Sequence, residues 1–280
     1  MKEKTKKTFL EKLNKYPGWL IFVLIVTTIS GLFTIVNGGK GVISIYRDTL
    51  GKNRVEENIV NKLSPMVDIS YFRDKLGQEI TKGSVDEGLT QYIFKRHTYF
   101  IKAITDDSDT VLFWSITSCN PKKPFRIIPN KERILNNSAN EIDNLNKIVL
   151  HKSSFNSVFP DLKNMNPTLF YYLSAATSNS YAVESYYGAN PGGYQTIYIG
   201  INDACSREVE KMYDYTDYLL NNEINGVELL EIKSSQLLSF RSNSKINVYG
   251  ESAPFFNIDH LLVDGEIDLG IDRIMTRVLR

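Results

Sequence analysis

The longest uncharged stretch of the sequence lies between Lys15 and Lys40, and most of its residues are apolar. A helix rises about 1.5 Å per residue, so roughly 20 such residues cross the ~30 Å hydrocarbon core of a bilayer. Tyr16 and Trp19 stand where aromatic side chains commonly meet the membrane interface. The pattern therefore predicts a transmembrane helix over residues 16–37.

A cleaved signal peptide is the competing interpretation of this stretch. A signal peptide has a shorter apolar region and a cleavage site made of small residues. Here the apolar stretch is long, and residues 37–40 read NGGK without an A-x-A pattern. We therefore expect an uncleaved anchor, followed by a glycine-rich juxtamembrane hinge over residues 38–53.

Positive charge sets the expected orientation of the anchor. Six lysines precede the helix within residues 1–15, and four lysine or arginine residues follow it within residues 38–54. Basic residues accumulate on the cytoplasmic side of a membrane. This modest bias predicts that residues 1–15 are a basic cytoplasmic flank of the membrane. The domain after the helix is then expected outside the cytoplasm.

Residues 54–280 have the pattern of a folded domain with short helices and strands. Apolar residues at every fourth position predict a helix over residues 54–63. A second helix is predicted after Asp68, whose carboxylate can cap it, and Gly77 supplies its end.

Two antiparallel strand pairs are also predicted. Tyr99–Thr105 and Val111–Thr117 are rich in strand-forming residues, and Asp106–Asp109 supplies the turn between them. Tyr181–Tyr187 and Tyr194–Ile201 form the second pair, and alternating isoleucines in the latter indicate a half-buried strand. The expected fold class is α+β: an N-terminal transmembrane helix followed by a soluble domain of short helices and antiparallel sheet.

The order of helix and hairpin occurs twice, over residues 54–120 and 148–203, with a short helix expected at Phe155–Phe159. A tandem repeat is one explanation. Coincidence is the other, because α+β domains commonly order their elements in this way. Of the remaining segments, residues 121–129 are predicted to be irregular, residues 207–220 helical and residues 246–249 a strand.

Residues 71–77 (YFRDKLG) and the hairpin at residues 99–117 resemble the small α+β module of outer-membrane assembly lipoproteins and β-lactamase inhibitor proteins. In that module a helix ending in a Leu-Gly step precedes an antiparallel sheet, and the inhibitor proteins carry two such units. This chain differs in having a transmembrane helix where those lipoproteins have a lipidated cysteine. With residues 186–194 (YYGANPGGY), the Leu-Gly step also resembles an uncharacterised bacterial family of single-pass membrane-anchored proteins. That resemblance implies a bacterial plasma (inner) membrane as the location of the anchor, and it implies no activity.

Composition narrows the function classes only slightly. The formal net charge of +1 argues against a dedicated nucleic-acid binder, which usually has a clear basic excess. Cys119 and Cys205 are the two cysteines of the chain. Buried free thiols are the interpretation that the residues favour, and one disulfide outside the cytoplasm is the alternative.

Motifs for catalysis or metal binding are scarce. His97, His151 and His260 are far apart and lack the spacing of metal ligands. A G-x-S-x-G hydrolase motif is missing from the sequence, and the aspartates at residues 106–109 are interpreted as turn residues instead of calcium ligands. The sequence therefore predicts no catalytic residue, no metal and no cofactor. An enzyme whose active site assembles only in space stays an alternative.

Tyrosine is the most suggestive residue type, with sixteen copies in the chain. Tyr186, Tyr187, Asn190 and Tyr194 surround a Gly- and Pro-rich segment between two predicted strands, a usual place for a binding site. Tyrosine offers a large rigid contact area and a hydroxyl group, so we predict that these four residues bind a ligand. The competing interpretation, which the pattern favours, is cross-strand aromatic packing.

We therefore expect a membrane-anchored, non-enzymatic binding or sensor module whose partners are the lipid bilayer and an unknown protein or small-molecule ligand. The alternative is a membrane effector, whose domain senses a signal and whose helices oligomerise to perturb the bilayer. Small and hydroxylated residues of the predicted helix, such as Gly31 and Thr34, are common where transmembrane helices pack, so a homo-oligomer fits the sequence.

Overall fold

The computed structural model of the chain describes residues 18, 52–129, 148–160, 167–174, 179–187, 195–204, 227–228, 235–263, 267 and 269–271. By its internal contacts the chain divides into two units, Met1–Val55 and Glu56–Arg280. The transmembrane helix predicted for residues 16–37 lies, apart from Gly18, outside the described residues. Within the described ranges, no helix is both long and apolar enough to cross a membrane.

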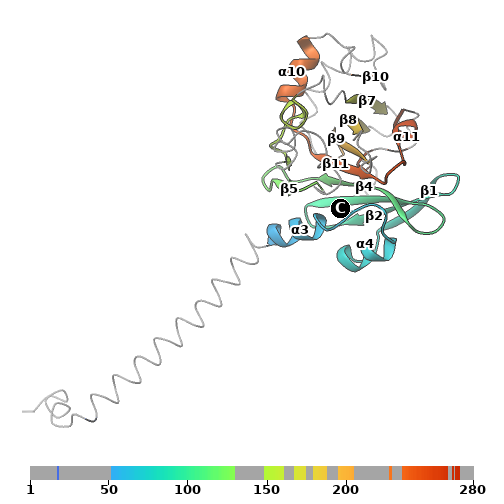
Figure 1. Cartoon of the computed structure of the whole chain (residues 1–280). Coiled ribbons are helices and arrows are strands. Elements are labelled where there is room, and N and C mark those ends of the chain that lie inside the picture. The colour runs from blue at the N-terminus through green and yellow to red at the C-terminus, as the bar shows by residue number, and fades with distance from the viewer. Residues whose placement is uncertain are drawn as a thin grey trace, which may run out of the picture. The chain divides into compact units, whose positions relative to one another are not determined.

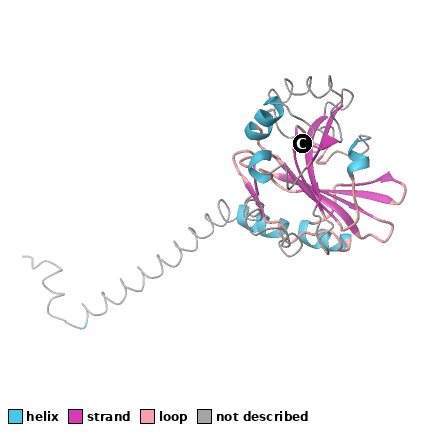
Figure 2. Ribbon diagram, turned by 45° about the horizontal axis from the view of Figure 1, so that its top comes forward, coloured by secondary structure: helices cyan, strands magenta, loops and turns pink. Residues whose placement is uncertain are grey.

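The second unit has the α+β fold that the sequence predicts, built on one antiparallel sheet (Figure 1). In spatial order the described strands of this sheet are β1 (Thr81–Asp86), β2 (Leu89–Lys95), β3 (Tyr99–Thr105), β4 (Val111–Ser118), β11 (Val248–Ser252), β9 (Thr196–Asn202), β8 (Asn179–Tyr187), β7 (Thr168–Ser174) and β10 (Val227–Glu228). A separate small sheet pairs β5 (Phe125–Ile127) with β6 (Ile148–Leu150). The described helices of this region are α3 (Lys52–Val60), α4 (Ile69–Leu76), α7 (Phe155–Val158), α10 (Ser235–Asn243) and α11 (Asp259–Val263), and Figure 2 shows them around the outside of the sheet.

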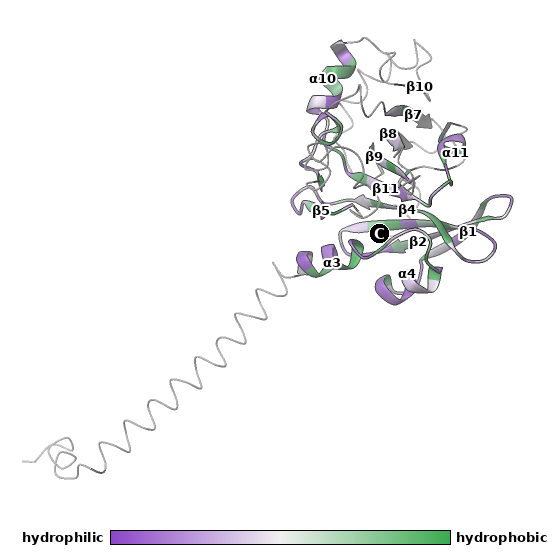
Figure 3. Cartoon of the chain, viewed as in Figure 1, coloured by the Kyte–Doolittle hydropathy of each residue, from purple (hydrophilic) through white to green (hydrophobic). Residues whose placement is uncertain are grey.

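Local sequence signals account for α4. Asp68 accepts a hydrogen bond from the Ser70 backbone N–H, which is the capping role expected of it. Gly77 ends the helix with φ of 88°, a backbone conformation that favours glycine. Apolar and polar bands alternate along α3 and α4, as expected for helices that bury one face (Figure 3).

The sheet has a hydrophobic core on each face. On one face, apolar residues of α3, α4, α7, α10, β5 and β6 share a cluster with Trp114 and Tyr249. On the opposite face, α11 and the following residues share a second cluster with Phe113 and Tyr198. The central strands are therefore buried on both sides. The half-buried pattern predicted for β9 is wrong, because the tyrosine at position 198 is as fully covered as the isoleucines beside it.

Several predicted elements are confirmed and others need correction. The turn at residues 106–109, the helix at residues 155–158 and both strand pairs occur as predicted. The segment predicted to be irregular at residues 121–129 contains β5, and β1, β2 and β7 are strands that the sequence reading did not identify. The helix predicted for residues 207–220 lies outside the described residues.

The C-terminal part of the chain joins the two predicted repeat units. Strands β1 to β4 come from residues 54–120, whereas β8 and β9 come from residues 148–203. The late strand β11 lies between β4 and β9 and pairs with both, so that one continuous sheet results (Figure 1). A true internal repeat stays a prediction, but the two hairpin units do stand on either side of one central strand.

Candidate functional site

Of the four residues predicted to bind a ligand, Tyr186 is the one whose side chain the structure describes. Tyr186 lies on β8 with 8 % of its surface exposed, and its ring packs on that of Phe159 at a centroid distance of 5.5 Å. Tyr187 is the last residue of β8, whereas Asn190 and Tyr194 lie outside the described residues. The ligand site predicted from these four residues therefore stays a prediction, and the one described side chain belongs to the core.

A pocket of about 250 Å³ lies elsewhere, against the face of the sheet that carries the larger core. The turn after α3 (residues 60–64) forms one wall, and the end of β5 (residues 127–129) forms another. Trp114 of β4 and Glu251 of β11 line it from the sheet. The pocket thus combines four segments that are separate in the sequence.

Asn61 fixes two of these walls to each other. Its side-chain amide donates to the Arg126 carbonyl at 3.3 Å, and its side-chain oxygen accepts from the Ile128 backbone N–H at 2.8 Å. The same side chain therefore satisfies one donor and one acceptor of the β5 edge. This bridge holds the turn after α3 at a set distance from β5 and so keeps the pocket formed.

Glu251 places a carboxylate in the pocket wall with only 3 % of the residue exposed. The Tyr249 hydroxyl donates to one carboxylate oxygen at 2.6 Å, and the Gln195 amide donates to the other at 3.2 Å. Burial and the Glu251 charge raise the pKa of Tyr249 well above its ordinary value, so the phenol keeps its proton and stays a donor. These two donors fix the orientation of the carboxylate.

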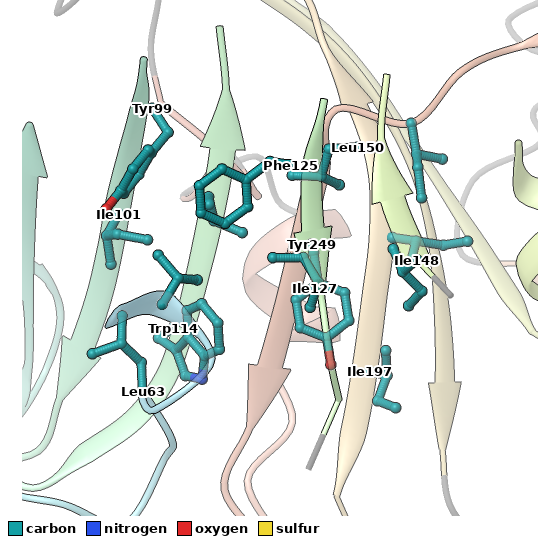
Figure 4. Close-up of a cluster of buried hydrophobic side chains, with 14 of the residues drawn as sticks. Leu63, Tyr99, Ile101, Trp114, Phe125, Ile127, Ile148, Leu150, Ile197 and Tyr249 are labelled. Carbon is teal, nitrogen blue, oxygen red and sulfur yellow. The ribbon is translucent and has the colours of Figure 1, made fainter. Parts of the chain in front are cut away.

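Trp114 contributes an indole N–H from the neighbouring strand. The residue is 2 % exposed, and within the part of the chain that the structure describes its Nε1 has no hydrogen-bond partner. The Trp114 and Tyr249 rings meet edge to face at a centroid distance of 6.0 Å, and Figure 4 shows their polar atoms at the same end of the cluster. A buried donor without a partner is costly, which makes this indole a natural contact for a bound ligand.

The pocket could not be predicted from the sequence, because no motif near any of its lining residues indicates a binding site. Trp114 reads as one more aromatic residue of a predicted strand, and Glu251 lies just beyond the strand predicted for residues 246–249. The one available signal is a glutamate inside an apolar strand, since carboxylates are rarely buried without a specific role.

His151 and Ser118 form the arrangement closest to a catalytic pair among the described residues. The His151 Nε2 atom lies 3.0 Å from the Ser118 carbonyl oxygen and 3.1 Å from the Ser118 hydroxyl. A carbonyl oxygen can only accept, so a hydrogen bond to it requires the tautomer that carries the hydrogen on Nε2. The contact ties β4 to the segment after β6.

The aspartate turn and the histidines provide no metal centre in the described ranges, where no group of at least three His, Cys, Asp or Glu residues could hold an ion. Asp106 instead accepts hydrogen bonds from the Ser108 hydroxyl and from the Ser108 and Thr110 backbone N–H groups. This is the pattern of a side chain that closes a turn.

Cys119, directly after β4, is disulfide-bonded, so the free-thiol interpretation of this residue is wrong. It packs against the small cluster of Phe100, Ala204 and Ile271. The second cysteine of the chain, Cys205, follows Ala204 directly and lies outside the described residues.

The pocket as a whole offers an oriented carboxylate, an indole donor and apolar walls. Such a set can bind a compact polar molecule, because one end of the ligand meets hydrogen-bonding groups and the rest meets apolar surface. Comparisons with protein-family models, with curated proteins and with solved structures find no match for this chain.

Proposed function

We propose that this chain is a membrane-anchored, non-enzymatic binding or sensor module that takes its ligand in the pocket between Trp114 and Glu251. The observation that carries the proposal is that two residues with buried polar groups, Glu251 with its oriented carboxylate and Trp114 with its indole N–H, line the same pocket. The indole N–H is costly to bury without a partner, and a ligand that hydrogen-bonds to it lowers that cost.

The proposed location is a bacterial plasma membrane, with residues 16–37 as the single transmembrane helix and residues 1–15 in the cytoplasm. The long apolar stretch and the lysines before it support the anchor and its orientation. The disulfide at Cys119 supports placing the folded domain outside the cytoplasm, since disulfides persist in oxidising compartments. Membership in the family of single-pass anchored proteins, suggested by Leu76–Gly77 and residues 186–194, is part of the same proposal.

A pocket-filling variant tests the binding function. Ser64 lines the pocket and is half-buried, so Ser64→Phe fills the space while Glu251 and Trp114 stay unchanged in the sequence. Ser84→Phe is the matched control, because Ser84 is exposed on the edge strand β1. A small-molecule fragment set is screened by saturation-transfer NMR against the full-length protein in detergent micelles.

We expect fragments that bind the wild type and Ser84→Phe to lose binding to Ser64→Phe. Two results overturn the proposal: fragments that bind Ser64→Phe as well as the wild type, or a wild type that binds no fragment at all. Thermal unfolding of each variant checks that the fold survives the substitution.

A further inference from the structure

Positive charge gathers at one end of the central sheet, where β4 ends at Ser118. Five basic side chains lie on β5 or in the connections that meet there. This set, which we call the basic rim, consists of Lys122, Lys123, Arg126, Lys152 and Lys245. All of them are exposed except Lys123, which is half-buried. Within the part of the chain that the structure describes, none of the five belongs to an ion pair, so their charges are available to a partner.

Backbone contacts bring the segments of the rim together. In the pairing of β5 with β6, Lys123 and Lys152 each lie two residues beyond the last pair of this small sheet. Ser154 forms a bridge with Lys245, which places the connection before β11 beside the turn after β6. The His151 Nε2 atom in that turn lies 3.0 Å from the last carbonyl oxygen of β4. The lysines of the rim therefore come from segments that contact one another at the end of the sheet.

Few acidic side chains offset this charge. The described segments that meet at this end contain a single acidic residue, and they are residues 95–99, 118–127, 150–155, 202–204 and 243–248. That acidic residue is Asp203, which is 2 % exposed. Helix α3 brings Glu56 close, but Arg96 binds its carboxylate through hydrogen bonds of 2.7 and 3.0 Å. The neighbouring Glu57 accepts a hydrogen bond from the Arg126 backbone N–H at 3.0 Å, and its one charge cannot balance five cations.

Negative charge lies at the other end of the sheet. The β1–β2 and β3–β4 turns there, residues 86–88 and 106–110, contain five acidic residues and no lysine or arginine. A Cβ atom on Gly88 would stand 3.3 Å from an Asp107 carboxylate oxygen, so the two turns adjoin. The eight residues of β4, at about 3.4 Å each, separate the two ends by roughly 25 Å. Salt screens charges beyond about 8 Å at physiological ionic strength, so each end meets a partner on its own.

An anionic membrane surface is the partner that this charge pattern fits best. Residues 38–51 separate the predicted transmembrane helix from α3, and even fully extended they reach no further than about 50 Å. The bilayer surface is therefore always present at a high effective concentration. Anionic lipid headgroups attract each lysine near the surface. The aromatic side chains Tyr99, Phe125 and Phe155 of the rim segments are buried, whereas proteins that bind single-stranded nucleic acid expose such rings for stacking.

We infer that the basic rim docks on anionic phospholipid headgroups of the membrane that holds the chain, an inference that rests on the transmembrane anchor of the proposed function. The lysine ammonium groups and the Arg126 guanidinium group pair with lipid phosphate groups. The acidic turns, roughly 25 Å away along β4, then lie outside the headgroup layer, where they are not repelled. The tether alone allows the domain any orientation, whereas the rim selects one.

Lysine acetylation tests this inference on the full-length protein in lipid nanodiscs of two compositions. One is phosphatidylcholine alone, and the other contains equal parts of phosphatidylcholine and the anionic lipid phosphatidylglycerol. Mass spectrometry after brief treatment with an amine-acetylating reagent gives the reaction rates of Lys122, Lys152 and Lys245. Lys82 is the internal reference, because it is exposed on the edge strand β1 and its ammonium group lies 5.0 Å from the Tyr92 ring, which is hydrogen-bonded to an aspartate of the acidic end.

We expect the three rim lysines to react about fivefold or more slowly in the anionic nanodiscs, because each is held at the headgroups, while Lys82 keeps its rate. High salt should restore the rates of the rim lysines. Lys152→Glu should bring Lys122 and Lys245 back towards their rates in phosphatidylcholine. Lys82→Glu, the matched control, makes the same charge change outside the rim and should leave the protection of the rim lysines intact.

Equal rates in the two nanodiscs, or equal slowing of Lys82 and the rim lysines, overturn the docking surface, and so does protection that Lys152→Glu leaves unchanged. In each of these cases the proposed anchor stands as long as the chain co-elutes with the nanodiscs. A chain that does not co-elute with them removes the anchor and the docking surface together. If an added oligonucleotide protects the rim lysines in phosphatidylcholine nanodiscs more strongly than the anionic lipid does, nucleic acid is the partner and the lipid assignment is wrong.

Discussion

Arg241 and Glu184 form an ion pair that is fully enclosed by the protein. The Arg241 Nε atom donates to one carboxylate oxygen at 2.6 Å, and Nη2 donates to the other at 3.1 Å. The same Nη2 donates to the Phe159 carbonyl at 2.8 Å. Both side chains are at most 1 % exposed. The pair joins α10 to β8 and to the residue that ends α7, and so fixes the layer over this half of the sheet.

Removing one partner of this pair should be strongly destabilising. Arg241→Ala leaves the Glu184 carboxylate buried without its cation, and we expect a loss of about 3–5 kcal/mol in the free energy of unfolding. Chemical denaturation of the full-length protein measures it. Asp74→Ala, which breaks the exposed Lys75–Asp74 pair, is the control and should leave the unfolding free energy nearly unchanged. If the two substitutions lower the free energy of unfolding equally, Arg241 is not enclosed by the protein.

Gly200 lies where β9 passes closest to its neighbour. A Cβ atom at this position would stand 2.7 Å from the Ala182 carbonyl oxygen and 3.0 Å from a Val183 methyl group. Gly200→Ala should therefore cost about 1–3 kcal/mol of stability through overpacking. Gly83→Ala in β1 is the matched control, because nothing lies within 4 Å of its Cβ position and alanine is no worse in a strand. A Gly200→Ala variant as stable as the wild type would contradict the pairing of β9 with β8.

Local signals in the sequence are enough to predict α4 and the hairpin of β3 and β4. Asp68 and Gly77 mark the ends of a helix through side-chain and backbone chemistry that acts within a few residues. The edge strand β1 was missed because Thr81–Asp86 is polar and carries a glycine, and an edge strand needs little apolar surface. The second core is also non-local. Residues after position 257 supply it, and no pattern within β9 shows that its other face is covered.

The disulfide at Cys119 should stabilise the domain. Cys119→Ser is expected to lower the free energy of unfolding by about 2–4 kcal/mol, as is typical for the loss of a native disulfide. Alkylation followed by mass spectrometry provides a direct check. The untreated protein should take up no label, and the reduced and unfolded protein should take up label at both cysteines of the chain. Labelling of the untreated protein would contradict the bond and would remove the support for an extracytoplasmic location.

The Asp106 turn should contribute to the pH dependence of stability. Hydrogen bonds hold the pKa of this carboxyl below its ordinary value, with the Ser108 side chain as the largest cause. The stabilisation is therefore present above the unfolded-state pKa of about 3.9 and is lost as the pH falls through the folded-state pKa. Asp106→Ala should be less stable than the wild type near neutral pH, and the gap should shrink towards pH ~2. Melting curves across this range test it, and a gap independent of pH would contradict this assignment.

The candidate site shows why function was harder to predict than fold. Trp114 and Glu251 are neighbours only because β11, from near the end of the chain, pairs with β4 from its first half. Tyr186, by contrast, belongs to a sequence rich in tyrosine and glycine that looks like a binding loop, yet its side chain packs on Phe159. In a strand that is buried on both faces, an aromatic residue can belong to the hydrophobic core as readily as to a binding site.

The most direct measurement of the central claim is the indole N–H resonance of Trp114 in the full-length Trp19→Phe protein. This variant has a single tryptophan, so its ¹H–¹⁵N spectrum contains one indole signal. Titration with a fragment that loses binding to Ser64→Phe should move that signal to a saturating end point, because the bound fragment lies against Trp114 in the pocket. The same titration of Ser64→Phe in this background should leave the signal nearly in place. If the indole signal of the Trp19→Phe protein does not move at a high concentration of such a fragment, the assignment of this pocket as a binding site is contradicted.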